Sequence, residues 1–379
     1  MQNTKEQISS HQLGYMIIFM AVIVHIIALP AQMAEAAGRD AWIVIAAYFL
    51  INAAAAALIL WVHRIYPGKT LFELVEACAG KIFSRVFAGV LGAYFLTRFY
   101  INFFGVEKFM IYNLYGNVSW RVFIVPAAIA LVFIAGTGLK SLARASELLG
   151  LAVLALIVLA VLFLCYKIKI YNFLPVFGDG LRPAAAGFAE YISVWGDFLP
   201  LLMFIGHFKK GDKIARGAVW GLTVAGLILV IMNILFICFY GNLAKYQYHG
   251  QALRDLAQFA AGSNSLARLD FLLLLAWLGM GFVNLGIFAF CILQCIHTAL
   301  NLHGGAKGKT VSAVICAVLI IAYSTVFGML EAQQYYYGPA KYVLSIPFCV
   351  LLPASVPVLA LVAKRKDNAH CSNAAMKVK

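Results

Sequence analysis

Ten long apolar stretches occupy most of this chain, and they constrain its fold more than any other feature of the sequence. Each is about long enough to cross a hydrocarbon core of ~30 Å, which takes roughly 20 helical residues. They lack the alternation of polar and apolar residues that barrel strands need, so we expect α-helices. The predicted spans are residues 13–37, 41–63, 84–106, 120–138, 145–166, 185–206, 216–241, 269–298, 310–328 and 341–363.

The composition also indicates a chain whose main solvent is lipid. Hydrophobic residues make up 64% of the 379 residues and charged residues 12%, and the mean hydropathy is +0.90. A soluble domain needs more polar surface than this. The predicted loops are too short to fold as independent domains. Residues 364–379 are predicted to form a short tail, and its part from Asp367 to Lys379 is predicted to be polar and disordered.

The distribution of basic residues predicts the orientation. An even number of spans puts both termini on one side, and Lys and Arg gather on that side, with Lys209, Lys210, Lys213 and the cluster 364–366 prominent. The positive-inside rule therefore predicts cytoplasmic termini. The net charge of +14 is scattered among loops and is not interleaved with stacking aromatics. We therefore predict contact with lipid head groups and no binding of nucleic acid.

The sequence offers no constellation typical of an enzyme or a metal site. The eight cysteines include no CxxC pair, and Cys291 and Cys295, which share a helix face, have no histidine at a ligand spacing. No nucleophile with a base and no phosphate-binding loop is apparent. We therefore predict no catalytic activity, no cofactor and no metal.

Two spans contain a Leu-Pro pair in mid-membrane, Leu29-Pro30 in span 1 and Leu199-Pro200 in span 6. They occupy the same position in each of two five-helix halves. Proline removes an amide donor and crowds the preceding turn, so both spans are expected to be broken there. Paired interruptions of this kind point to a midplane site in an inverted-repeat transporter, although two ordinary proline kinks would give the same pattern.

Six short motifs occur in order along nearly the whole chain. They are residues 8–12; Leu29-Pro30 with Gly38–Trp42; residues 66–71; Gly138–Lys140 with Arg144 and Glu147; Asn172–Pro175 with Gly180 and Pro183; and Arg268–Asp270. Together they resemble the spore germination protein family, the B subunits of Ger-type nutrient germinant receptors, in the amino acid/polyamine/organocation transporter superfamily.

This resemblance implies a leucine-transporter-like, all-α membrane fold with an inverted five-plus-five repeat, about residues 13–166 and 185–363. It implies a sporulation protein of the spore inner membrane or cell membrane, which binds a small nutrient, expected to be an amino acid, and triggers germination. Its partners would be A-type subunits and C-type lipoprotein subunits. The alternatives are a proton-coupled amino-acid permease and a conduit for solute or water, because one fold can host all three functions.

The chain departs from the family pattern in span 1. Members usually carry a Gly-x-Gly-x-x-Thr-Leu-Pro stretch, in which small residues let a ligand carboxylate approach backbone amides. Residues 23–30 here keep the Leu-Pro but have neither glycine nor the threonine. β-Branched side chains crowd such a backbone site. The ligand is therefore expected to be different, smaller, or recognised by side chains.

Polar residues inside the spans are the candidates for a ligand site, because ionisable groups in hydrocarbon are costly and usually paired. Arg98 is predicted to face a ligand carboxylate, and Asp197, where the family commonly has Gly-Glu, its ammonium group. A structural ion pair between the two, a contact of Arg98 with Asn102, and a buried His25 without a ligand role are the alternatives. The predicted ligand-binding residues are Val24, His25, Ile26, Ala28, Thr97, Arg98, Gly196, Asp197 and Asn284.

Other polar residues are predicted to have structural roles. Asn284 is also a candidate for interhelical hydrogen bonding, together with Asn233 and Gln294. Structural ion pairs are predicted from Arg268 and Asp270 at the outer end of span 8, and from Arg144 and Glu147 at the entry to span 5.

Overall fold

The computed structural model shows an all-α protein, as the sequence predicts. It describes residues 7–110, 121–165, 168–178, 180–190, 198–209, 212–246, 269–302, 306–329 and 345–377, some of them by their backbone alone. Within these ranges there is no β-strand, only one isolated bridge between Ile8 and Phe208.

Nine helices are long. They are α1 (Ser10–Ala37), α2 (Ala41–Ile65), α4 (Lys81–Met110), α5 (Arg121–Gly136), α6 (Leu139–Cys165), α9 (Ile214–Tyr240), α11 (Leu269–Ala299), α12 (Ala306–Met329) and α15 (Leu352–Lys377) among the described residues. Between them lie short elements: η1 (Gly38–Asp40), α3 (Leu71–Ala79), η3 (Ile170–Phe173), α7 (Leu181–Glu190), α8 (Pro200–Phe204), η5 (Ile205–His207), η6 (Gly241–Tyr246) and the π-helix η7 (Ile346–Leu351).

The long helices overlap nine of the ten predicted spans, and in the last of them, 341–363, the described residues divide between η7 and α15. By length and composition, seven stretches of the described residues can cross a membrane, and Ser10–Val22 and Val122–Gly136 are shorter apolar helices. The predicted span 185–206 corresponds to α7, α8 and η5, which flank residues 191–197, outside the described residues. The chain is thus a multi-pass membrane protein.

The structure corrects the expected break in span 1. Helix α1 continues from Ser10 to Ala37 with Pro30 inside it. A proline removes one N–H and crowds the carbonyl four residues earlier, here that of Ile26, but a helix can absorb both effects by bending. In span 6 a helix begins at Pro200, the first residue of α8, where the missing N–H costs nothing.

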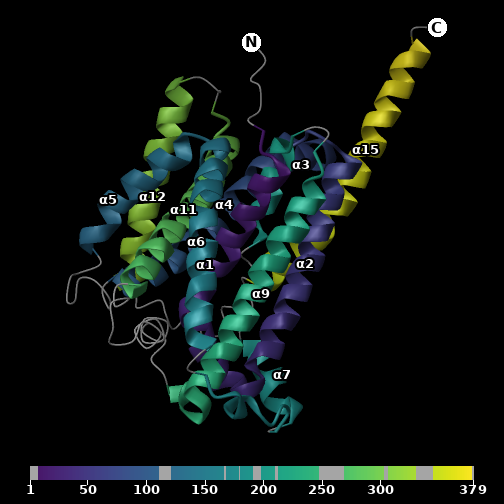
Figure 1. Ribbon diagram of the computed structural model, residues 1–379. Coiled ribbons are helices and arrows are strands. Elements are labelled where there is room, and N and C mark those ends of the chain that lie inside the picture. The colour runs from purple at the N-terminus through teal and green to yellow at the C-terminus, as the bar shows by residue number, and fades with distance from the viewer. Residues whose placement is uncertain are drawn as a thin grey trace.

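The C-terminal tail is helical where disorder was expected. Helix α15 extends to Lys377 and projects beyond the other helices (Figure 1). The sequence explains this continuation, because no glycine or proline follows Pro357, and alanine, lysine and methionine favour helix.

Helix packing relates the two predicted halves. Helices α2 and α9, which are the second spans of the two halves, pack on each other. Helices α4 and α11, the third spans of the two halves, do the same. Helix α1 packs most extensively on α9 and also contacts α6, α7 and α11. It therefore lies in the interior of the bundle, where a functional site can form around it (Figure 1).

Glycines bring α1 and α9 into backbone contact. A Cβ atom added at Gly217 would lie 1.8 Å from the carbonyl oxygen of Ser10, and one at Gly221 would lie 2.5 Å from that of Gly14. Gly217 and Gly221 are spaced as in the GxxxG pattern, which lets membrane helices approach closely. This crossing fixes the position of α1.

The start of α1 and the end of α15 lie at the same end of the bundle (Figure 1), as an even number of spans requires. From the charge distribution we predict that this end is cytoplasmic. A topology reporter fused after Lys379 should be active only inside the cell. Activity only outside the membrane would reverse the orientation.

Candidate functional site

One cluster of buried polar side chains lies between α4, α11 and α1. The Asn102 side chain donates from Nδ2 to Oδ1 of Asn284 at 3.0 Å. Nδ2 of Asn284 donates in turn to the carbonyl oxygens of Phe19 at 3.2 Å and Met20 at 3.5 Å. Both amides are buried. The structure thus gives Asn284 the interhelical role predicted for it and joins α4 and α11 to the backbone of α1.

Arg98 lies one turn before Asn102 on α4 and is only 4% exposed. Residues four apart share a helix face, so the guanidinium belongs to the same side of α4 as the asparagine cluster. A cation at this depth is costly unless it has a partner. Asp197, the partner predicted for it, lies outside the described residues, and the pair stays a prediction.

Thr97 lies on a different side of α4. Its Oγ1 forms a 2.8 Å hydrogen bond with the Tyr323 hydroxyl of α12 and a 3.0 Å bond to the Ala93 carbonyl. The ring of Tyr323 also packs edge-on against Tyr100, with centroids 6.1 Å apart. The structure therefore places Thr97 between α4 and α12, apart from the contacts of Asn284.

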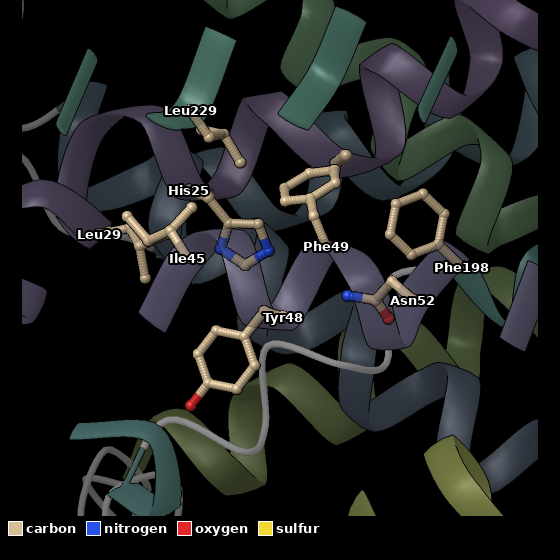
Figure 2. A pocket seen from close by; sticks show the side chains of 9 residues that line it. His25, Leu29, Ile45, Tyr48, Phe49, Asn52, Phe198 and Leu229 are labelled. Atoms are coloured by element: carbon tan, nitrogen blue, oxygen red, sulfur yellow. The ribbon is translucent and has the colours of Figure 1, made fainter. Parts of the chain in front are cut away.

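A small cavity lies on another side of α1. His25 of α1 and Asn52 of α2 point into it (Figure 2), and both are buried, with 6% and 3% exposed. Its lining consists of Ala21, His25, Leu29, Ile45, Tyr48, Phe49, Asn52, Phe198 and Leu229. The predicted ligand residue His25 thus faces α2 and α9. Arg98, in contrast, lies on the face of α4 that carries Asn102.

This cavity is too small for a nutrient in the present conformation. The centre of a water molecule can move over about 10 Å³ of it, which is room for about one water. Its surface is mainly apolar, and its described lining carries an imidazole, an amide and a phenol. The Tyr48 hydroxyl already donates to the carbonyls of Gly187 and Phe188 in α7.

The remaining predicted ligand residues are only partly described. Ile26 is buried, at 5% exposed. The side chains of Val24 and Ala28 and all of Gly196 lie outside the described residues. Arg268 and the side chain of Asp270 also lie outside the described residues. The ion pair predicted between them therefore stays a prediction.

Glu147, predicted to pair with Arg144, bonds to the start of α1. Its Oε1 lies 3.1 Å from Nδ1 of His11, and its Oε2 accepts from Nε2 of Gln12 at 3.1 Å. Arg144 is exposed. The contact joins α6 to the start of α1, a long-range pairing that spacing along one helix cannot reveal.

A second polar cluster, not predicted, connects two of the motifs at the opposite end of the bundle. The Asp40 carboxylate accepts from the Phe177 amide at 3.0 and 3.1 Å. Arg39 donates from Nη1 to the Leu174 carbonyl and from Nη2 to Oδ1 of Asn242 at 2.6 Å. The sequence signal that could have indicated this cluster is the adjacent charged pair Arg39-Asp40, which closely follows the predicted span 13–37.

Glu107 was missed because the predicted span ended at residue 106. Helix α4 continues to Met110 and buries Glu107, which is 6% exposed. It is a second ionisable residue of α4, after Arg98, that the structure places in the interior.

The asparagine cluster makes a prediction about stability. Asn284→Leu leaves the buried Asn102 amide without its acceptor, which costs about 1–3 kcal/mol. Thermal unfolding in detergent should show a clear fall in Tm, with a similar fall for Asn102→Leu. In the double variant, Tm should fall by less than the sum of the two single falls, because neither asparagine amide is left without its hydrogen-bond partner. Strict additivity would contradict this coupling.

Comparison with known proteins gives a consistent result. A family model described as "Spore germination protein" matches residues 7–329. Spore germination protein KB of Bacillus subtilis (strain 168) is 22% identical over 373 residues, which cover 96% of each chain. The family expected from the six motifs is thereby confirmed.

Solved transporter structures share the fold. A Na+-coupled sialic acid symporter in a substrate-bound outward-open state aligns with a TM-score of 0.62 and 10% identity, over 96% of this chain and 88% of that one. Mhp1, a nucleobase-cation-symport-1 family transporter in a closed conformation, aligns with a TM-score of 0.57 and 13% identity, over 95% and 91%. At these identities the likeness concerns the fold alone, which is leucine-transporter-like as predicted.

Proposed function

The chain belongs to the spore germination protein family, and from this membership we propose that it is the membrane subunit of a nutrient germinant receptor. In this role it binds a small nutrient, an amino acid by preference, and triggers germination. The proposal includes a location in the spore inner membrane.

The buried polar cluster around α1 supports a ligand site in the interior of the bundle. In hydrocarbon, polar groups without partners are costly, and those retained in the interior of membrane proteins usually serve a site. Asn102 and Asn284 connect α4 and α11 to the α1 backbone, and Arg98 lies one turn away. Its guanidinium suits a carboxylate, which it can hold with two parallel hydrogen bonds.

The helical state of α1 supports recognition by side chains. Backbone amides within a continuous helix already donate to carbonyls four residues earlier, so residues 23–30 offer few free amides to a ligand carboxylate. This agrees with the absence of the family's glycines. In the proposed site Arg98 binds the carboxylate and Asp197 the ammonium group of a zwitterion.

The partners belong to the proposal as well. We expect an A-type subunit and a C-type lipoprotein, in keeping with the family. The pairing of α2 with α9 and of α4 with α11 supports two repeats, about residues 13–166 and 185–363.

A proton-coupled permease is the second candidate, because both solved structures described above are named as a symporter or a transporter. Uptake by the isolated chain separates the two. Purified protein in liposomes with an imposed proton gradient should not accumulate labelled amino acids, and in cells it should be stable only beside its A-type and C-type partners. Accumulation against a gradient by this chain alone would replace the receptor with a permease.

A further inference from the structure

The cavity between α1, α2 and α9 contains a polar group that the proposed nutrient site does not use. Asn52 lines it from α2, and its side chain is 3% exposed. The amide makes no hydrogen bond with any residue in the described part of the chain. Figure 2 shows it directed into the space that His25 enters from α1.

A primary amide in this position needs a partner. It has two N–H donors and a carbonyl acceptor, and the surrounding hydrocarbon supplies neither kind of group. Buried polar groups in folded proteins are satisfied by protein atoms or by ordered water in the great majority of cases. The side chains of Phe49, Phe198 and Leu229 offer none. A small molecule inside the cavity would supply the missing partner.

The cavity restricts what this partner can be. There is room for about one water molecule. None of the described lining residues is an aspartate, glutamate, lysine or arginine that could balance an ion. The occupant is therefore small, uncharged, and able both to donate and to accept a hydrogen bond.

We propose that this cavity is a binding site for a single water molecule, held between the side-chain amide of Asn52 and the imidazole of His25. The water bonds α1 to α2 beside Leu29, next to Pro30, which has no backbone N–H to donate within α1. The site is separate from the asparagine cluster of α4 and α11. It does not depend on which nutrient the protein binds, or on whether it binds one.

Asn233 provides a matched control. It lies on α9 one turn beyond Leu229, is fully buried, and makes no hydrogen bond with a described residue. Unlike Asn52, it does not line the cavity. The change of asparagine to leucine has nearly the same shape effect at both positions, but only at Asn52 does it remove the proposed water ligand.

The test is a cryo-EM structure of the full chain in lipid nanodiscs, bound to an antibody fragment, at a resolution that shows water. The wild type should have one density peak within hydrogen-bonding distance of the Asn52 side chain and the His25 ring. Asn52→Leu should lose the peak, and Asn233→Leu should keep it.

An empty wild-type cavity, a protein partner on the Asn52 amide, or a peak that persists in Asn52→Leu would each overturn the proposal. If Asn52→Leu does not fold, Asn52→Ser retains a hydroxyl that can hold the water and should keep the peak. The wild-type map decides the matter even without the variants.

Discussion

Replacing Gly217 or Gly221 of α9 with valine is expected to remove almost all folded protein from the membrane. The new Cβ atoms would lie 1.8 Å from the Ser10 oxygen and 2.5 Å from the Gly14 oxygen. These are backbone atoms, so relief requires the separation of α1 from α9. We expect a destabilisation at the upper end of single substitutions, about 4–5 kcal/mol, measured by membrane abundance and by thermal unfolding in detergent.

Gly89 and Gly105 of α4 are the matched controls for this experiment. Both are exposed, and a Cβ atom at either position would meet nothing within 4 Å. Valine there should leave abundance near that of the wild type. If the membrane abundance of all four valine variants fell equally, the loss would reflect the low helix propensity of valine and not the close crossing of α1 and α9. If Gly217→Val and Gly221→Val accumulated normally, the close crossing would be wrong.

Replacing Arg98 with glutamine should abolish the nutrient response and lower the amount of folded protein. Removing one partner of a buried ion pair leaves the other charge uncompensated, which costs about 3–5 kcal/mol, more than one lost contact. Asp197→Asn should behave in the same way, because we propose that Asp197 is the partner. The double variant should recover part of the folded protein but not the response, since neither charge of the ligand would then be bound.

Membrane abundance and the nutrient concentration for half-maximal germination are the two measurements. Arg144→Gln, which removes an exposed arginine, should change neither. The proposed ion pair and the ligand site built on it would have to be abandoned if both single variants reached wild-type abundance and responded at unchanged nutrient concentrations.

The spans were predictable from the sequence because lipid permits few alternatives. Within hydrocarbon a chain must satisfy its own backbone groups, so a long apolar run predicts a helix almost unaided. Proline is less decisive, since it is compatible with unwinding and with bending alike. Helix α1 remains helical through Pro30, and the broken span predicted there was wrong in this respect.

Contacts between distant segments were not predictable. Glu147 bonds to His11 and Gln12, more than 130 residues away, and Asp40 bonds to the amide of Phe177. The motifs containing these residues were recognised, but their spacing carries no information about which motif meets which. That depends on how the helices pack.

The sequence identified polar residues of the interior but not the direction in which each points. Successive helical residues are about 100° apart around the axis, so a helix presents neighbouring residues to different partners. Thr97 and Arg98 illustrate this, because Thr97 bonds to Tyr323 of α12 while Arg98 shares the face of Asn102. His25, similarly, lines the cavity beside α2 and α9.

We propose that this chain enables a spore to respond to a nutrient. The most direct measurement compares germination in two spore strains that keep the A-type and C-type subunits. One carries this chain as its sole member of the family, and the other carries none. Across a panel of amino acids and sugars, the first strain should germinate with at least one nutrient and the second with none. Identical responses of the two strains to every nutrient would rule out the proposed receptor function.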